Sequence, residues 1–292
     1  MINTDVDFNQ KRDFSDIINV TFSFIKQEFK ELFSTIAIYT FIPLLGVAII
    51  SVFYTSDIWG TYIQGIVSRS PAVEAPNLTY LLLLIVLSIV GNIMVMGITF
   101  EYVNLYNIKG KGNFTRADVA NAFAKDFLKI LGYNLVIFIV IFFAFLFFII
   151  PGIYLSVPLA FVTLVLIAEK TGFSKSWSRC FEFIRDNWWI TFALILITYI
   201  IIGIMSLVFS IPMSIYGGIQ GYTAASVGEF DMNFGILTIF SIISTLGSAW
   251  LYVIMYIMLG AQYYSLNSNK SKASSILDRI NEIEDRPVED SF

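Results

Sequence analysis

Few side chains in this chain of 292 residues could do chemistry. The sequence contains no histidine, so no imidazole is available as a base near neutral pH or as a metal ligand. The single cysteine, Cys180, can form no internal disulfide, and its sequence surroundings do not indicate a reactive thiolate. The phosphate-loop motif GxxxxGK(S/T) and the GxSxG and HExxH motifs are absent from the sequence. We therefore expect a protein that is not an enzyme and that holds no cofactor and no metal ion.

One acidic side chain, Glu101, falls inside a long apolar run. A charged group at the bilayer centre costs about 2.5–3.5 kcal/mol on insertion scales and is a functional candidate by default. Glu101 lies five residues before the end of its run, so it is within about 8 Å of the membrane surface. Two interpretations stay open: coupling of protons or cations through the carboxylate, and solvation at the interface or pairing with a basic residue of a cytoplasmic loop. Asn92 is the other polar candidate, but it lies half a turn out of phase with Glu101, so the two do not share a face.

Small residues in the last two apolar runs indicate close helix packing. Small side chains four residues apart let helix backbones approach and form interhelical hydrogen bonds. The candidates are Ser241, Ser244, Ser248 and Gly203. No apolar run carries paired acids, an arginine series or a carbonyl-filter sequence, which argues against a coupled pump, a voltage sensor and a potassium-type pore.

The composition assigns the chain to the membrane class. Apolar residues make up 57% of the sequence and charged residues 14%, and the mean hydropathy is +0.76. An ordinary soluble domain is about 45–50% apolar and about 25% charged. A soluble fold of this size could not hide so much apolar surface, because roughly a quarter of its unfolded surface stays exposed after folding. The net charge of −4 indicates no nucleic-acid partner.

The elements that position these residues are membrane-spanning helices, each of which needs about 20 mostly apolar residues. Six segments approach or exceed this length: 33–54, 78–106, 130–150, 153–168, 189–211 and 234–264. They predict an all-α integral membrane protein with a cytoplasmic N-terminal segment (1–32), a six-span membrane domain (33–264) and a cytoplasmic tail (265–292). The first apolar run begins after 32 mixed residues and is too long for a signal sequence, so we expect no cleavable signal.

The boundary at Pro151-Gly152 is compatible with a tight hairpin between two spans or with a kink within one long helix. The six apolar segments divide the rest of the chain into seven stretches, from the N-terminal stretch to the tail. In that order the stretches contain 4, 1, 5, 0, 4, 0 and 4 of the 18 Lys and Arg residues. Positive residues stay on the cytoplasmic side, and 17 of the 18 do so only if the chain turns back here. We therefore predict three hairpins, a turn after Ile150 on the outer side, and both termini in the cytoplasm.

Three segments with an apolar stripe at the helical period lie before the first span of each hairpin: 14–33, 115–131 and 173–188. The second opens with a near capping box, Thr115-Arg116-Ala117-Asp118. We expect each segment to rest at the membrane interface, with its apolar face among the acyl chains and its basic face toward water.

The tail carries a similar pattern. Four apolar residues share one helical face opposite acidic and basic side chains: Ile276, Leu277, Ile280 and Ile283. Either the tail is a short amphipathic helix that ends in a disordered acidic stretch, or these residues are a contact site for another subunit.

Two stretches carry a resemblance to known families. The run from Lys129 to Leu155, with Ile149-Ile150-Pro151-Gly152 inside it, and the stretch from Ser174 to Trp189 resemble motifs of bacterial polytopic membrane families. These families include the membrane domain fused to some glycerophosphodiester phosphodiesterases. The resemblance covers roughly residues 110–260 and implies a six-helix, non-catalytic domain of the bacterial cytoplasmic (inner) membrane. The catalytic domain of those enzymes has no counterpart after the last span, so no catalytic residue is carried over.

We expect a non-catalytic membrane scaffold or accessory subunit of a larger inner-membrane assembly. Its partners would be the lipid bilayer and other membrane protein subunits. The alternative is a transporter or lipid-handling protein that uses a cavity between the hairpins, with Glu101 and Asn92 as its polar lining.

Overall fold

A computed structural model describes residues 5–67, 77–227 and 233–284, and in 59–60, 62–67, 224, 227 and 269–284 it describes the backbone alone. These ranges form the helices α1 (Phe14–Val67), α2 (Leu78–Lys109), α3 (Arg116–Phe147), α4 (Ile149–Leu159), α5 (Val162–Glu169), α6 (Phe173–Ile184), η1 (Arg185–Asn187), α7 (Trp188–Val227) and α8 (Phe234–Glu284). No strand occurs within the described ranges, so the predicted all-α class is confirmed.

Six helical segments are long and apolar enough to cross a membrane, as the composition predicted. They are Phe14–Ile58, Leu78–Lys109, Arg116–Phe147, Ile149–Glu169, Phe173–Thr223 and Phe234–Ser268. Two of the segments expected at the interface are continuous with the spans that follow them, because α1 and α3 run on without a break. The third, α6, is separated from α7 by the short helix η1.

Local capping explains where α2 ends and α3 begins. Gly110 ends α2 at a φ of 81°, a conformation that glycine adopts at no steric cost, and its N–H donates to the carbonyl of Tyr106. The predicted capping box is present: Thr115 Oγ1 accepts from the N–H of Asp118 at 3.2 Å, and Asp118 Oδ2 accepts from the N–H of Thr115 at 2.8 Å.

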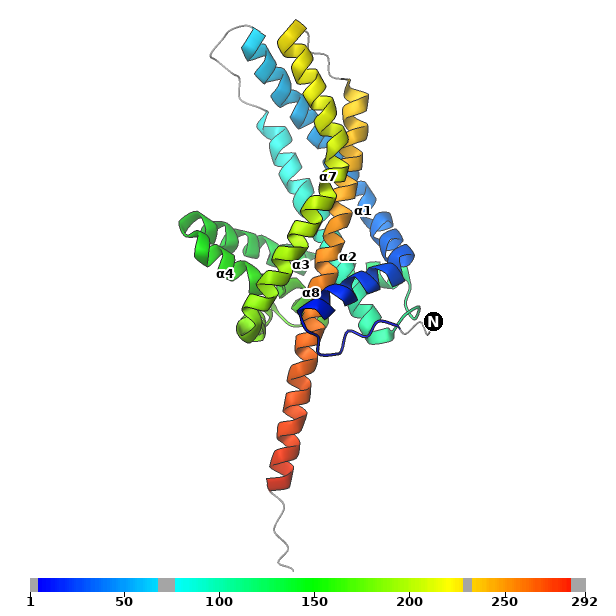
Figure 1. Cartoon of the computed structure of the whole chain (residues 1–292), viewed down its shortest axis with the longest axis vertical. Coiled ribbons are helices and arrows are strands. Elements are labelled where there is room, and N and C mark those ends of the chain that lie inside the picture. Colours follow the sequence, from blue (N-terminus) through cyan, green and yellow to red (C-terminus); the bar gives the residue numbers. More distant parts are fainter. Residues whose placement is uncertain (1–4, 68–76, 228–232, 285–292) are drawn as a thin grey trace, which may run out of the picture.

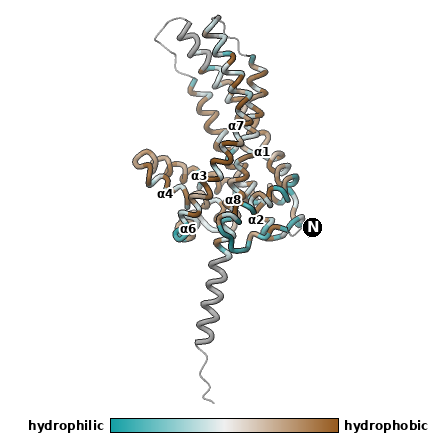
Figure 2. Tube along the Cα trace, viewed as in Figure 1, coloured by the Kyte–Doolittle hydropathy of each residue, from teal (hydrophilic) through white to brown (hydrophobic). Residues whose placement is uncertain are grey.

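The helices divide into a long bundle, a lateral hairpin and a projecting helix (Figure 1). Helices α1, α2, α7 and α8 pack on one another and run along the long axis of the molecule. The hairpin of α3 and α4 leaves this bundle sideways, and the last part of α8 continues past the other helices to Glu284. Figure 2 shows the bundle and the hairpin as predominantly hydrophobic.

The hairpin predicted at Pro151-Gly152 is confirmed, but its turn lies earlier. The break falls at Phe148, whose backbone is extended (φ −154°, ψ 119°), and Pro151 sits in the first turn of α4, where its missing N–H is not needed. Gly152 lets the two legs meet, since a Cβ there would lie 2.7 Å from the ring of Phe145. The hairpin leaves the bundle sideways (Figure 1), and the position of its turn on the outer side of the membrane stays a prediction.

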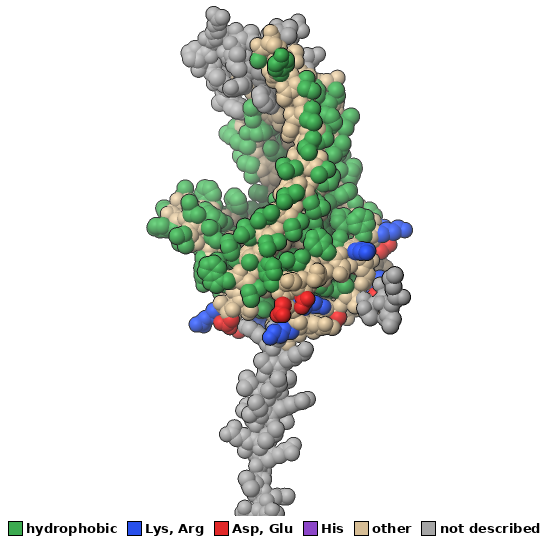
Figure 3. All heavy atoms as spheres, in the orientation of Figure 1, with side chains coloured by type: hydrophobic (Ala, Val, Ile, Leu, Met, Phe, Trp, Pro, Cys, Tyr) green, Lys and Arg blue, Asp and Glu red, His purple; other side chains and the backbone are tan. Residues whose placement is uncertain are grey.

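Charged side chains gather at one end of the bundle, which we call the charged end: residues 5–31, 101–129 and 169–185. Figure 3 shows their band below the apolar surface of the bundle and the hairpin. The clustering agrees with the alternation of basic residues along the sequence.

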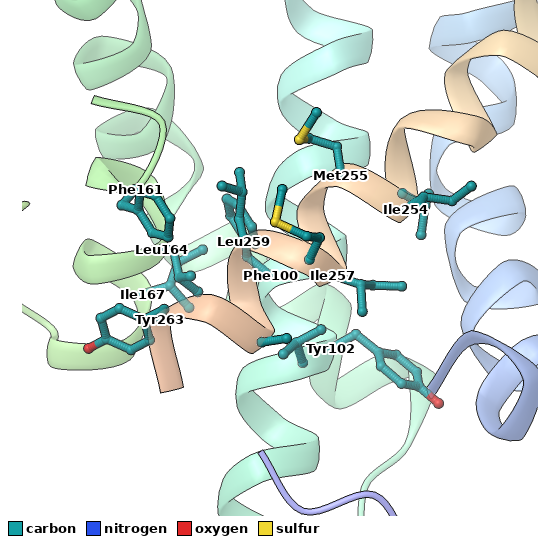
Figure 4. Close-up of a cluster of buried hydrophobic side chains, with 14 of the residues drawn as sticks. Phe100, Tyr102, Phe161, Leu164, Ile167, Ile254, Met255, Ile257, Leu259 and Tyr263 are labelled. Atoms are coloured by element: carbon teal, nitrogen blue, oxygen red, sulfur yellow. The ribbon is translucent and has the colours of Figure 1, made fainter. Parts of the chain in front are cut away.

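The protein core lies in the half of the bundle next to this end. In α2 the buried residues begin at Gly91 and concentrate toward Tyr106. Helix α5 is buried along its length, and Figure 4 shows its Leu164 and Ile167 among side chains such as Phe100 and Leu259. Many apolar residues farther from the charged end are exposed, as expected for helices that face lipid rather than one another.

Candidate functional site

Glu101 is buried in the core near the charged end and faces a lysine. Its side chain is 1% exposed, and its Oε1 lies 3.6 Å from Nζ of Lys170. Lys170 also reaches Oδ2 of Asp126 at 3.3 Å and is itself 57% exposed. The pairing with a basic loop residue, one of the two interpretations of Glu101, is therefore present.

The position of Lys170 depends on an unusual backbone. Lys170 ends α5 in the left-handed conformation, with φ 51° and ψ 38°. This turn brings its ammonium group from the surface to the carboxylates of α2 and α3. Oε1 of Glu101 accepts no hydrogen bond in the described structure, so the ion pair is the main compensation of its charge. The arrangement ties α2, α3 and the end of α5 together.

Asn92 does not join Glu101. It is exposed, and its Nδ2 donates to the carbonyl of Ser88 in its own helix at 2.8 Å. The two polar candidates therefore lie on different faces of α2, as their spacing predicted. They do not line a common cavity.

Glu28 is a second buried acid, which the sequence pattern did not single out. Its Oε2 accepts from the hydroxyl of Tyr102 at 2.7 Å, and its Oε1 lies 3.7 Å from Nζ of Lys111. Glu28 lies on the face of α1 that also buries Phe24 and Leu32. This corrects the expectation that the face opposite the apolar stripe is turned to water. The signal was the four-residue spacing of Phe24, Glu28 and Leu32.

A polar cavity of about 350 Å³ adjoins Glu28. Lys30, Lys111 and Arg116 contribute positive charge to its lining, and Glu31 pairs with Arg116 at 2.8 Å. The carboxylates already neutralise part of this charge.

Among the described residues, no group of three or more acidic or cysteine side chains is arranged to hold a metal ion. Cys180 is fully buried.

Hydrogen bonds surround α8 where it leaves the bundle, in a stretch we call the exit segment (residues 262–268). Three of these bonds join it to other helices: Gln262 to Thr191 of α7 at 3.0 Å, Tyr263 to Glu169 of α5 at 3.0 Å, and Tyr264 to Asn104 of α2 at 3.0 Å. Glu169 is also paired with Arg179 of α6 at 3.2 Å. Arg179 also donates to Asn267 Oδ1 at 3.5 Å, so the exit segment is attached to α2, α5, α6 and α7.

The N-terminal segment also forms hydrogen bonds with the exit segment. The main-chain N–H of Arg12 donates to Ser265 Oγ at 2.9 Å, and Ser268 Oγ donates to the carbonyl of Asn9 at 3.1 Å. The Arg12 guanidinium donates to the carbonyls of Phe8 and Asp7. Partial burial lowers the pKa of this guanidinium, which nevertheless stays charged as arginines do in proteins.

The small residues predicted to pack have different environments. Ser241 is buried and bridges α8 to α1, with its Oγ 2.6 Å from Oγ of Ser51 and 3.0 Å from the carbonyl of Ala48. Ser244 and Ser248 are half-buried. Gly203 is exposed, and a Cβ there would meet no atom within 4 Å, so it makes no close helix contact within the described chain.

An apolar groove of about 810 Å³ lies between α1, α7 and α8. Its lining includes Phe29, Ala37, Phe209 and Trp250. The only hydroxyl in the lining, that of Ser34, is used by its own helix, since it donates to the carbonyl of Glu31 at 3.1 Å. The indole N–H of Trp250 is buried and has no acceptor among the described residues.

The apolar residues of the tail lie outside the residues whose side chains are described. The backbone of α8 is helical through all of them: Ile276, Leu277, Ile280 and Ile283.

No protein-family model, no curated protein and no solved structure matches the chain. The resemblance to the membrane domain of the phosphodiesterases therefore stays a prediction.

Proposed function

We propose that the protein is a non-catalytic membrane subunit that holds a partner protein on the charged side of the membrane by means of α8. The observation that carries this proposal is the way α8 leaves the bundle: the exit segment bonds to α2, α5, α7 and the N-terminal segment, and the helix then continues alone to Glu284. A helix that is fixed at its base and free beyond it suits a docking element.

The charged end supports the same function. Its two buried acids both have partners from other segments: Glu28 accepts a hydrogen bond from Tyr102 of α2, and Glu101 is paired with Lys170 at the end of α5. Such pairs connect α1, α2 and the end of α5, which all pack beside the base of α8 or bond to it. They do not give the paired, water-accessible acids that a proton-coupled transporter uses.

The sequence of the projecting helix has the pattern that helical partners recognise. Ile276, Ile280 and Ile283 recur at i, i+4 and i+7, and Asp278 and Glu282 occupy the opposite positions. Anionic lipid headgroups would repel the acidic residues of this segment, which favours a protein partner over the membrane surface.

We expect site-specific photo-crosslinkers at Ile280 and Ile283 to capture one protein in stoichiometric yield, and a crosslinker at Glu282 to capture little of it. The double substitution Ile276→Asp and Ile280→Asp should abolish the crosslinks, because it places charge on the apolar face. Asp278→Asn is the matched control on the opposite face and should leave them unchanged.

Equal crosslinking on both faces, or purification of a lipid-bound monomer that deletion of residues 271–292 does not alter, would contradict the proposed function.

The groove favours a second candidate, a lipid-handling protein. Its apolar lining suits one acyl chain, and its volume is in the usual range of ligand sites, about 300–1,000 Å³. Trp250 contributes its ring to the groove wall while its N–H is buried, so the groove offers a bound lipid apolar contact and not a hydrogen bond.

Trp250→Phe is expected to reduce the lipid retained by the purified protein about threefold, because the smaller ring removes part of the apolar wall of the groove. Ala37→Phe should reduce it further by filling the groove. Ile139→Phe adds the same bulk to an exposed position on α3 and serves as the control. Native mass spectrometry measures the bound lipid, and unchanged binding in both groove variants would exclude this site.

A further inference from the structure

The tip of the α3–α4 hairpin is a continuous apolar surface. Phe148 is 68% exposed and Ile150 81% exposed, and their neighbours Phe147 and Ile149 are similarly open. The sequence from residue 130 to residue 168 contains no charged side chain. Figure 2 shows the hairpin in hydrophobic colours out to its end. A surface of this kind is stable in hydrocarbon and unfavourable in water.

The part of the return leg that faces lipid is too short to cross a bilayer, although the whole stretch Ile149–Glu169 is long and apolar enough to do so. Helix α4 has 11 residues, which span about 16 Å, whereas the hydrocarbon core is about 30 Å thick. Helix α5 does not extend this leg along the lipid, because the residues from Val162 to Ile167 are buried against the core around Phe100 and Leu259 (Figure 4). Only α4 is available to return through lipid.

A proline and a tryptophan fix the base of α4. Pro158 has no N–H, so the carbonyl of Tyr154 loses its partner within the helix. The indole N–H of Trp188, at the start of α7, donates to this carbonyl at 3.1 Å, and the two rings stack with centroids 5.5 Å apart. Tryptophan favours the membrane interface. The contact therefore joins the return leg to the α6–α7 junction near the charged end.

We propose that the α3–α4 hairpin enters the membrane from the charged side and turns back within the same leaflet, so that acyl chains of that one leaflet surround its tip. Lys129 precedes the hairpin and Lys170 follows it, so both legs start from the same aqueous surface. The sideways direction in Figure 1 is the direction that a shallow hairpin needs, since α1, α2, α7 and α8 together define the membrane normal. Four apolar segments then cross the bilayer, and the hairpin adds area to one leaflet only.

Cysteine accessibility tests this proposal in the full-length protein in native membranes. In the Cys180→Ala background we introduce Ile150→Cys at the tip and, separately, Lys125→Cys at the exposed start of α3. Ile150 is not shielded by protein, so only lipid can protect a thiol placed there. We expect a membrane-impermeant maleimide to label position 125 from one side and to leave position 150 unlabelled from both sides until the membrane is dissolved in SDS.

A bimane probe on the same cysteine reports on depth. Its fluorescence should be quenched by lipids brominated along the acyl chain and not by aqueous iodide. Labelling of position 150 from the side opposite to position 125 would show a hairpin that crosses, and labelling from the same side would show one that lies in water. Either result overturns the proposal. Ile149→Cys repeats the test should the first variant fail to accumulate.

Discussion

Lys170→Met is expected to lower the melting temperature of the purified protein by roughly 5–10 °C. The substitution removes the ammonium group that faces Glu101 and leaves a carboxylate that is 1% exposed without its counter-charge. Removal of one partner from a buried pair costs about 3–5 kcal/mol. We expect the lower end, about 3 kcal/mol, because Lys170 itself is 57% exposed. A loss of 1 kcal/mol shifts the melting temperature of a chain of this size class by about 2–4 °C.

The matched variants separate charge from other effects. Glu101→Gln should cost little, because it keeps the shape of the side chain and leaves Lys170 free to reach water and Asp126. The double variant Glu101→Gln, Lys170→Met should therefore recover most of the stability. Lys129→Met is the exposed control, since Lys129 pairs with Asp126 at 3.1 Å and does not contact a fully buried acid.

Methionine is chosen because its side chain is nearly as long as that of lysine. Both residues also have the same energetic cost in the left-handed backbone conformation at position 170, so the backbone does not contribute to the difference in stability. Thermal unfolding in mild detergent measures all four proteins. Equal melting temperatures for Lys170→Met and Lys129→Met would show that the Glu101 carboxylate needs no counter-charge. The transporter interpretation of Glu101 would then regain support.

The helices could be predicted from composition, but the continuity of α1 and α3 with the amphipathic segments before their spans could not. Apolar runs of about 20 residues identify the segments because a bilayer requires that length. The sequence between residues 14 and 33 contains good helix formers and no glycine or proline, so nothing stops α1 from beginning at Phe14. The amphipathic segment 14–33 and the apolar segment 33–54 predict two elements, but one helix can carry both patterns, as α1 does.

The partners of the buried acids lay beyond sequence reasoning. Glu101 could be recognised because it interrupts an apolar run. Its partner could not, because Lys170 reaches it through a left-handed turn 69 residues later along the chain, and several other loop lysines were equally plausible. Glu28 was missed for another reason: an amphipathic analysis assumes that the polar face meets water, whereas this one meets Tyr102 of α2.

Uniformly apolar segments give no sign of which side chains form the protein core. Leu146 and Leu164 belong to two neighbouring apolar segments of the same hairpin unit. In the structure Leu146 is 63% exposed near the hairpin tip, whereas Leu164 is fully buried. Figure 4 shows Leu164 beside Phe161 and Ile167, in the cluster that α5 forms with α2 and α8. Only the folded arrangement distinguishes contact with lipid from contact with protein.

Leu164→Ala is accordingly expected to lower the melting temperature by roughly 5–10 °C, and Leu146→Ala by no more than about 2 °C. Loss of a buried leucine costs about 2–5 kcal/mol through lost contacts and the cavity left behind. We expect about 2–3 kcal/mol for Leu164, because its alternative environment in the membrane is hydrocarbon and not water. At Leu146, acyl chains or detergent fill the space that the smaller side chain leaves, so no cavity forms. Thermal unfolding in the same detergent compares the two variants. Large losses for both would show that the hairpin tip is packed against protein, and small losses for both would show that α5 is not part of the stabilising core.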